Sequence, residues 1–561
     1  MKYLHTFLQT RIGRIGAVLS VCVCSFFVHL GAPEAGLMEA RNFVAAREMV
    51  AGGSWLLPTM NGALRLAKPP LPTWAVAGVQ MLTGPTDNLA VLRLPAASMA
   101  TLLVFFFWGL ARELTRRMPG EQEQPGRTAW LAALMLASSL LVITVGRDGQ
   151  WDIFSNAWMV GCLWLLTRAL RTGQLLLYAT AGLLLAASFL SKGPVALYAL
   201  LLPFVVASCT PWGLRGQVAK GWGLGVAVFV GVGALLGSLW PWYVWERVQP
   251  EVLAIARVEV ASWGERHVQP VSYYLNFPVF TGVWALAALA ALVVPYARGR
   301  AGRYVPYWYG LVWLVLTLIF LSIVPEKKER YMLPLIPPLV LLLAGLIRSW
   351  EQGNADSQPG SSGRVDGLLL KTWGGLLLLV CLGLPAALLV VQLPGFRPTQ
   401  LAFWFVCLGA AGLGYRVVIL GLIGGRATSL VAASLALQCG LLGLLMPAYA
   451  AWETRKADRS IRQMADVRKK HGGPAYSWYS LSEMQIKQVW QAGRPIRRWQ
   501  PDTTQLGAKA AVLITAQRLL PTHALGQQAP GYAVALIDSF YVGRNRASEQ
   551  LFVFRIQRVA K

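Results

Sequence analysis

Long apolar segments recur along this chain of 561 residues, and charged residues or Pro and Gly separate them. A helix that crosses the hydrocarbon core of a bilayer needs about 20 mostly apolar residues. The pattern therefore predicts an α-helical multi-pass membrane protein with about thirteen spanning helices. They are expected over residues 15–31, 92–111, 128–146, 153–170, 175–190, 194–208, 223–241, 276–296, 306–324, 331–348, 372–392, 401–422 and 428–450.

The charges between the apolar segments predict the orientation of the chain. Lys2, Arg11 and Arg14 precede the first segment, and no small-residue cleavage site follows it, so we interpret it as a span with the N-terminus inside and not as a signal peptide. Arg and Lys then recur in the inside loops, which also include a flexible linker at Gly353–Gly363. The basic residues of these loops are Arg112, Arg116, Arg117, Arg127, Arg168, Arg171, Arg215, Lys220, Arg298, Arg300, Arg303, Arg348, Arg364, Lys371, Arg416 and Arg426. An odd number of spans places the tail outside.

The tail is predicted to be a small soluble α/β domain. One segment, Glu483–Gln491, has a helical pattern. Four segments rich in β-branched and aromatic residues are typical of strands, namely Ala475–Tyr479, Lys509–Ile514, Tyr532–Ile537 and Leu551–Ile556. The predicted domains are a transmembrane domain over 1–450, with outer loops at 32–91 and 242–275, and the tail over 451–561.

Composition agrees with a membrane protein. Hydrophobic residues make up 55% of the chain and charged residues 14%, whereas soluble domains carry about 25% charged residues. The net charge of +26 is explained by basic inside loops and a basic tail that face anionic membrane lipids, so no nucleic-acid partner is predicted. The seven cysteines lie in or beside apolar segments, and none lies in the tail, so no disulfide framework or metal site is predicted.

The first outer loop combines charged and apolar residues in an unusual way. Glu39 and Arg41 begin an amphipathic helix, and Phe43, Val44 and Met49 form its apolar side. A spanning helix would not tolerate these charges, and a soluble loop would not need these apolar residues. We therefore expect an interfacial loop that holds an acid and a base at the level of lipid head groups.

A lysine near the end of the same loop is expected to bind phosphate. Lys68 is followed by Pro-Pro-Leu-Pro, which fixes the backbone and is predicted to stop a helix from forming there. A rigidly held ammonium group at the membrane interface suits a phosphate.

Two further clusters lie at helix ends. Asp148 and Asp152 occupy a tight outer turn together with Arg147. They are interpreted either as a helix cap with an ion pair or as part of a binding site. Lys192 precedes Gly-Pro at a break between two short apolar segments, and it is a third candidate.

Two more clusters lie in later outer loops. Glu259, Arg266 and His267 precede a pair of tyrosines, and these neighbouring residues favour a functional role for the histidine. In the other loop, three cations and an aromatic residue stand at the outer end of a helix, where positive charge is disfavoured: Lys327, Lys328, Arg330 and Tyr331. An anionic ligand would account for them, and Glu326 and Glu329 provide an alternative as counter-charges.

These outer loops together suit a sugar linked to a lipid phosphate. Cations can hold the phosphate, and a carboxylate can accept a proton from an acceptor hydroxyl. The sugar–phosphate bond is already activated, so the reaction needs positioning and charge stabilisation more than a cofactor.

The order of these motifs resembles a known family. The motifs are Glu39-Ala-Arg41, Ala46-Arg-Glu-Met49, Lys68-Pro-Pro-Leu-Pro, Lys192-Gly-Pro, Pro241-Trp-Tyr243 and Tyr331-Met-Leu-Pro334. They resemble the aminoarabinose transferases that modify lipid A, which are grouped with the protein O-mannosyltransferases among the GT-C membrane glycosyltransferases. The resemblance covers residues 10–350 best, and it is weak in the tail.

The resemblance implies a fold and an activity. It implies thirteen helices, a periplasmic C-terminal domain and a bacterial inner-membrane location. It also implies that a polyprenyl-phosphate sugar donates its sugar to a lipid, glycolipid or other envelope acceptor on the periplasmic side. Arg41, Lys68 and Lys327 match family positions that bind phosphate or sugar phosphate, and Tyr331 matches a wall residue.

The chain departs from the family at three places. Met38 stands where relatives carry the first acid of an acidic pair, so Glu39 or its neighbour Glu34 is the predicted catalytic base. A divalent metal stays open as a cofactor, but Ala67 replaces the acid that would hold it. Relatives carry Glu-His in the second long outer loop, where this chain has Glu259-Val, with His267 further on.

Two other functions compete with the glycosyltransferase. A transporter or flippase of lipid-linked sugars would be expected to have charges at the bilayer midplane and inverted repeats, and neither is visible here. A non-catalytic protein that binds lipid head groups or assists assembly would be favoured if the Met38 departure removed activity.

Overall fold

The computed structural model describes residues 10–213, 218–249, 254, 267–353, 361–456, 459–471, 476–481, 483–499, 511–515, 532–541 and 550–558. The chain divides into two compact units. The first consists of residues 1–32, 66–72 and 93–451, and the second of residues 33–65, 73–92 and 452–561. The second unit therefore combines most of the predicted first outer loop with the predicted tail.

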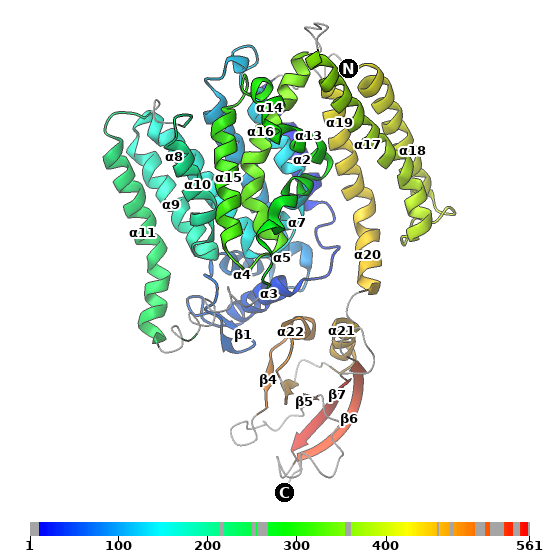
Figure 1. Cartoon of the computed structure of the whole chain (residues 1–561). Helices are drawn as coiled ribbons and strands as arrows, with labels where there is room; N and C mark the ends of the chain where they lie inside the picture. The colour runs from blue at the N-terminus through cyan, green and yellow to red at the C-terminus, as the bar shows by residue number, and fades with distance from the viewer. Residues whose placement is uncertain are drawn as a thin grey trace. The chain divides into compact units, whose positions relative to one another are not determined.

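The first unit is helical in the described residues (Figure 1). The N-terminal part comprises α2 (Arg11–Cys22), η1 (Val23–Phe27), α5 (Leu89–Thr115, in this unit from Arg93), η2 (Pro119–Glu121), α6 (Arg127–Ala137), α7 (Leu140–Gly146), α8 (Trp151–Thr172) and α9 (Leu175–Lys192). The central part comprises η3 (Leu197–Leu201), α10 (Leu202–Ser208), α11 (Trp222–Arg247), η5 (Val271–Trp284), α13 (Ala285–Leu292), α14 (Val294–Ala301), α15 (Tyr307–Ile323), η6 (Glu329–Leu335) and α16 (Ile336–Gly353). The last part comprises α17 (Ser361–Val391), α18 (Leu401–Arg416), η7 (Val417–Ile423), α19 (Ala427–Gly440), η8 (Leu441–Leu445) and α20 (Met446–Lys456, in this unit to Ala451).

Many of these helices are long and apolar enough to cross a membrane. Within the described residues, nine helices meet that condition, and α6 with α7 would make a tenth span bent by 59°. Two apolar helices, Leu197–Ser208 and Tyr307–Ile323, are shorter. The first helix begins at Arg11 and its π-helical end is at Phe27, so it lies about four residues before the predicted segment 15–31.

The core of the first unit is built around α16. In the apolar window of its span, which includes η6, 94% of the residues are buried, and it packs against α6, α13, α14 and α15. Its surroundings are therefore other helices of the unit. On another side, α8 packs on α9 and α9 on α11 (Figure 1). This packing brings the first turn of α8 close to the last turn of α9.

The second unit begins with the predicted amphipathic helix, α3 (Leu37–Val50). The prediction is confirmed, since Phe43, Val44 and Met49 are buried. Gly36 is its N-cap, and the Gly36 N–H donates to Glu39 Oε2 at 2.9 Å. This contact satisfies one of the backbone donors that a helix start leaves unpaired. The small hairpin of β1 (Thr59–Met60) and β2 (Ala63–Leu64) follows.

A five-stranded sheet completes the second unit. Its strand order is β4-β3-β5-β7-β6, with β3 parallel to both β4 and β5 and with β7 antiparallel to both β5 and β6. The strands are β3 (Ser477–Ser480), β4 (Ile496–Arg498), β5 (Ala511–Thr515), β6 (Tyr532–Tyr541) and β7 (Gln550–Arg558), and the helices are α21 (Arg459–His471) and α22 (Ile486–Ala492). Each of the four predicted strand segments contains a strand, and β4 was not predicted.

The segment after Lys68 corrects one prediction. Pro-Pro-Leu-Pro does not prevent a helix, because α4 (Leu71–Thr83) begins inside it. Pro72 occupies the first turn, where its missing N–H would have no partner in any helix and its fixed φ suits the helical backbone. The prolines therefore mark where α4 begins.

Candidate functional site

The centre of the site is a buried ion pair between two neighbouring helices. Asp152 lies in the first turn of α8, and Lys192 is the last residue of α9. Their side chains form an ion pair and are 5% and 6% exposed. Gly193 ends α9 with a φ of 73°, a left-handed conformation that glycine adopts most easily. The Lys-Gly-Pro motif therefore ends the helix at the lysine that faces Asp152.

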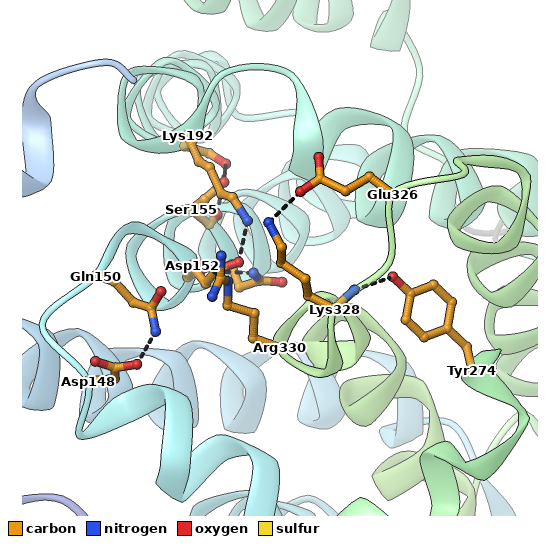
Figure 2. A network of polar contacts seen from close by, with 11 residues as sticks. Asp148, Gln150, Asp152, Ser155, Lys192, Tyr274, Glu326, Lys328 and Arg330 are labelled. Atoms are coloured by element: carbon orange, nitrogen blue, oxygen red, sulfur yellow. Dashed lines mark hydrogen bonds and ion pairs between the residues drawn. The ribbon is translucent and has the colours of Figure 1, made fainter. Parts of the chain in front are cut away.

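A third segment brings a second cation and an aromatic ring. Arg330 and Tyr331 lie in the first turn of η6. Arg330 Nε is 3.3 Å from Asp152 Oδ2, and Lys192 Nζ lies 4.2 Å from the centre of the Tyr331 ring. Figure 2 shows Lys192 and Arg330 approaching the same carboxylate from different helices. Each charge in this buried cluster therefore has a partner, as desolvated charges require.

A second ion pair lies beside the first. Lys328 pairs with Glu326, and the Lys328 backbone N–H donates to the Tyr274 hydroxyl at 3.3 Å (Figure 2). The Gln150 side-chain amide donates to the Asp148 carboxylate. Glu326 is thus the local counter-charge of Lys328, one of the two alternatives that the sequence left open.

Lys327 differs from its neighbours because the acceptors of its ammonium group are backbone carbonyls. Its Nζ donates to Val324 O at 2.8 Å and to Gln269 O at 3.2 Å. The residue is 3% exposed, and burial lowers the pKa of its ammonium group. The segment is held in place by the Lys327 N–H, which donates to His267 O at 3.1 Å. The two carbonyl oxygens replace part of the hydration that this buried ammonium group loses.

Lys327, Lys328 and Arg330 line a cavity of about 580 Å³. Leu140, Leu141, Thr144, Val145 and Phe280 form its apolar part. Its polar part is formed by Asp148, Gln150, His267, Gln269, Tyr273, Lys327, Lys328, Glu329 and Arg330. A cavity with apolar side chains and with three cations against two acids suits a ligand that carries both an apolar chain and a negative charge.

The structure brings together many of the residues predicted from the sequence. Asp152, Lys192, Arg330 and Tyr331 form the buried cluster, and Lys68 lies in the same unit, within electrostatic range of Lys192. Asp148, His267, Lys327 and Lys328 line the cavity. Glu34, Glu39 and Arg41 belong to the second unit, where Glu39 is buried and Glu34 and Arg41 are half-buried. Glu259 and Arg266 lie outside the described residues.

Sequence reasoning missed the serines behind the ion pair. Ser155 and Ser188 contact each other, with their hydroxyl oxygens 3.2 Å apart. Their spacing could have indicated this, because Ser155 is three residues after Asp152 and Ser188 is four before Lys192. Residues at these spacings share one helix face.

The cluster does not fit a divalent metal ion. Both oxygens of Asp152 already face cations, and Ala67 supplies no ligand. Among the residues that the structure describes, no three His, Cys, Asp or Glu side chains are grouped as a metal site would require. Lysine and arginine, the cations of this cluster, are side chains that proteins use to bind phosphate and carboxylate groups.

Comparison with known proteins adds the family context. The model of the family described as dolichyl-phosphate-mannose-protein mannosyltransferase matches residues 67–235. The chain is 27% identical over 362 residues to an undecaprenyl phosphate-alpha-4-amino-4-deoxy-L-arabinose arabinosyl transferase of Proteus mirabilis, over 60% of each chain. It is 30% identical over 377 residues to the protein of that name from Edwardsiella ictaluri, over 64% of this chain and 61% of the relative. The matches thus cover about 60% of the length of these relatives.

The fold comparison extends over nearly the whole chain. The crystal structure of ArnT from Cupriavidus metallidurans bound to undecaprenyl phosphate is similar, with a TM-score of 0.66 and 16% identity, over 97% of this chain and 98% of that one. The resemblance predicted from the sequence is confirmed. The chain is a multi-pass membrane protein with the GT-C fold. The matched family segment contains Lys68, Asp152 and Lys192.

Proposed function

We propose that this protein is a glycosyltransferase that moves a sugar from a polyprenyl-phosphate donor to a lipid A-like or other envelope acceptor at the periplasmic face of the inner membrane. The observation that carries the proposal is the arrangement of cations in the first unit. Lys192 and Arg330 share one carboxylate, Lys68 lies within electrostatic range, and Lys327 lines the adjacent cavity. Such a set can bind a phosphate monoester or diester.

The relatives support the choice of donor. The proteins of Proteus mirabilis and Edwardsiella ictaluri carry undecaprenyl phosphate and an aminoarabinose in their names, and the similar crystal structure holds undecaprenyl phosphate. A polyprenyl phosphate has an apolar chain and an anionic head. The cavity offers leucine, valine and phenylalanine side chains next to lysine and arginine, and this matches both parts of the ligand.

The proposed reaction is a displacement at the sugar carbon that carries the phosphate. The acceptor oxygen bonds to that carbon, the carbon–oxygen bond to the phosphate breaks, and the electron pair leaves with the polyprenyl phosphate. Lys68, Lys192 and Arg330 stabilise the charge on the departing phosphate, and Lys327, Lys328 and Arg41 help to bind it. Glu39 accepts the acceptor's proton. Asp148, His267, Glu259 and Arg266 are proposed to bind the sugar, and Tyr331 forms a wall of the site.

The proposed topology has thirteen spans. Within the described residues, these comprise the nine long apolar helices, α6 with α7 as one bent span, the two shorter apolar helices and the helix that begins at Arg11. The N-terminus is proposed to be cytoplasmic and the tail, with its α/β sheet, periplasmic. The basic residues of the inside loops support this orientation.

The topology is testable with reporter fusions. A reporter that is active only outside the inner membrane is expected to work when fused after Lys561 and to fail when inserted in the Gly353–Gly363 linker. The measurement is the activity of the reporter in intact cells, relative to the amount of fusion protein. The opposite pattern would place the acids and cations of the site in the cytoplasm and refute the orientation.

The activity is testable with the purified protein in detergent. Release of polyprenyl phosphate from a polyprenyl-phosphate sugar, together with a mass shift of the acceptor lipid, is the expected result. Binding of the donor without release would instead favour a non-catalytic protein that binds lipid head groups, which the Met38 departure makes a specific alternative.

Lys68→Ala is expected to lower the rate of donor cleavage by about two orders of magnitude, because a charge-assisted contact to the leaving phosphate contributes a few kcal/mol. Folding is expected to stay normal, since Lys68 is half-buried in a loop. Lys220→Ala, which removes an exposed lysine, is the control. A Lys68→Ala protein with the wild-type rate would exclude Lys68 from the phosphate site.

A further inference from the structure

The motif Ala46-Arg47-Glu48-Met49 is not accounted for by the proposed chemistry, and its contacts point elsewhere. It lies in the last turns of α3, the helix that begins with Glu39 and Arg41. Ala46 and Met49 are buried in a hydrophobic core of the second unit. That core also contains Trp478, Val489 and Val512 of the tail. Helix α3 and the tail therefore share one core, although they are far apart in sequence.

Arg47 links α3 to α22 through polar contacts. Its guanidinium donates to Val489 O at 3.2 Å and to Trp490 O at 3.5 Å, and it lies 5.8 Å from the centre of the Trp490 ring. The two carbonyls are in the last turn of α22, where the helix dipole favours a cation. The Trp490 carbonyl also accepts from the Gly493 N–H at 3.0 Å. Next to this contact, the rings of Phe43 and Trp490 are 5.4 Å apart.

Arg47 is half-buried, and the geometry of its contacts favours arginine over lysine. Desolvation lowers the pKa of Arg47 to about 10, and Asp87 and Glu48 partly oppose the decrease. The guanidinium therefore stays charged at neutral pH and depends on its carbonyl partners. A lysine would keep the charge but could not offer two parallel donors and a flat face for the tryptophan at once.

Glu48 makes a second link through the hairpin. Its carboxylate accepts from Thr59 Oγ1 at 2.5 Å and from the Asn61 N–H at 2.7 Å. Asn61 in turn pairs with the edge strand β4, donating from Nδ2 to Ile496 O and accepting at Oδ1 from the Ile496 N–H, both at 2.7 Å. Asn61 has a φ of 57°, a backbone conformation that asparagine tolerates better than most residues.

A third link lies beyond the hairpin. Arg468 Nη1 of α21 is 2.6 Å from Asp87 Oδ2, in the segment that precedes α5. The tail thus contacts the first loop near its start, at its hairpin and near its end. This accounts for the grouping of residues 33–65, 73–92 and 452–561 in one compact unit.

We propose that the tail is the positioning element of the first loop and that Arg47 is the positioning residue through which α22 sets the place of Glu39 and Arg41. Glu39 is eight residues before Arg47, about 12 Å along a helix. A change in the position of Arg47 on α22 is therefore transmitted to Glu39 through one rigid helix. The catalytic part of this inference rests on the proposed function. The mechanical part, that Arg47 ties α3 to α22, does not.

The test uses the full-length protein in detergent and three variants. Arg47→Met removes the charge and the donors but keeps an apolar stem. Arg47→Lys is the conservative variant, and Arg498→Met removes an exposed arginine of β4 as the matched control. Hydrogen exchange of the amides in residues 37–50 and 486–492 reports the link. Donor cleavage gives kcat and the donor KM.

Arg47→Met is expected to raise amide exchange in α3 and α22 together and to lower kcat about tenfold or more. The donor KM is expected to rise by less than kcat falls, because Arg41 is the one proposed phosphate ligand on α3, whereas Lys68, Lys192 and Arg330 belong to the first unit. Arg47→Lys should show both effects to a smaller extent, and Arg498→Met should behave like the wild type.

Unchanged exchange in α3 of Arg47→Met would overturn the inference, whatever its rate. A lower kcat together with a higher donor KM in every variant, the control included, would also overturn the inference, because that result indicates general unfolding. A wild-type protein that releases no polyprenyl phosphate would refute the proposed function instead, and the exchange measurement would still decide whether Arg47 links the two helices.

Discussion

Asp152→Asn is expected to destabilise the protein by about 3–5 kcal/mol and to stop sugar transfer, because it leaves the buried Lys192 and the half-buried Arg330 without their shared counter-charge. Lys192 and Arg330 both face the Asp152 carboxylate. Without the carboxylate they would repel each other, and their orientation toward a phosphate would change. Thermal unfolding in detergent and release of polyprenyl phosphate are the measurements.

A double variant separates the effect on stability from the effect on chemistry. Asp152→Asn combined with Lys192→Met removes one of the two unpaired cations, so it is expected to be more stable than Asp152→Asn alone but equally inactive. Ser155→Ala, which removes a hydroxyl behind the ion pair, should cost only about 1 kcal/mol and keep activity. An Asp152→Asn protein as stable as the wild type would contradict the role given to this ion pair.

Glu39→Gln is expected to abolish turnover while the protein folds and binds its donor. Glu39 occupies the third position of α3 and accepts the Gly36 N–H. A glutamine at this position can make the same capping contact, so the substitution removes the charge and the proton acceptor and leaves the helix start intact. Donor binding and polyprenyl-phosphate release, measured on the same preparation, separate the two effects.

Two further variants test whether the position of the acid matters. Glu34→Gln is expected to keep activity, and an inactive Glu34→Gln with an active Glu39→Gln would exchange the two roles. Met38→Glu in the Glu39→Gln background introduces an acid at the position where the family resemblance implies one, and partial recovery of turnover is expected. If Glu34→Gln and Glu39→Gln are both active, the base lies in another loop, with Asp148, Asp152 and Glu259 as the next choices.

Hydropathy alone predicted the class of the protein, because the bilayer imposes a minimum apolar length on every spanning helix. It also located most of the helices to within about six residues, whereas α17 begins eleven residues before the predicted segment 372–392. The motif residues Asp152, Lys192 and Arg330 were picked out by charge at a helix end, where an uncompensated charge is costly. The beginning of α4 at Leu71 was missed, because proline in a first turn and proline that breaks a helix look alike in a sequence.

The partners of these residues could not be predicted. That Asp152 pairs with both Lys192 and Arg330 depends on how α8 packs against α9 and η6, and no local pattern encodes that packing. The same holds for Arg47, whose acceptor on Val489 is 442 positions away. The amphipathic pattern of α3 predicted that one side would be buried, but it did not specify the partner, because any apolar surface of suitable shape can bury an apolar face. Only the tertiary structure decided that this partner is the tail, because hydrophobic burial is non-directional and the choice is made by packing and by the few polar groups that must find acceptors.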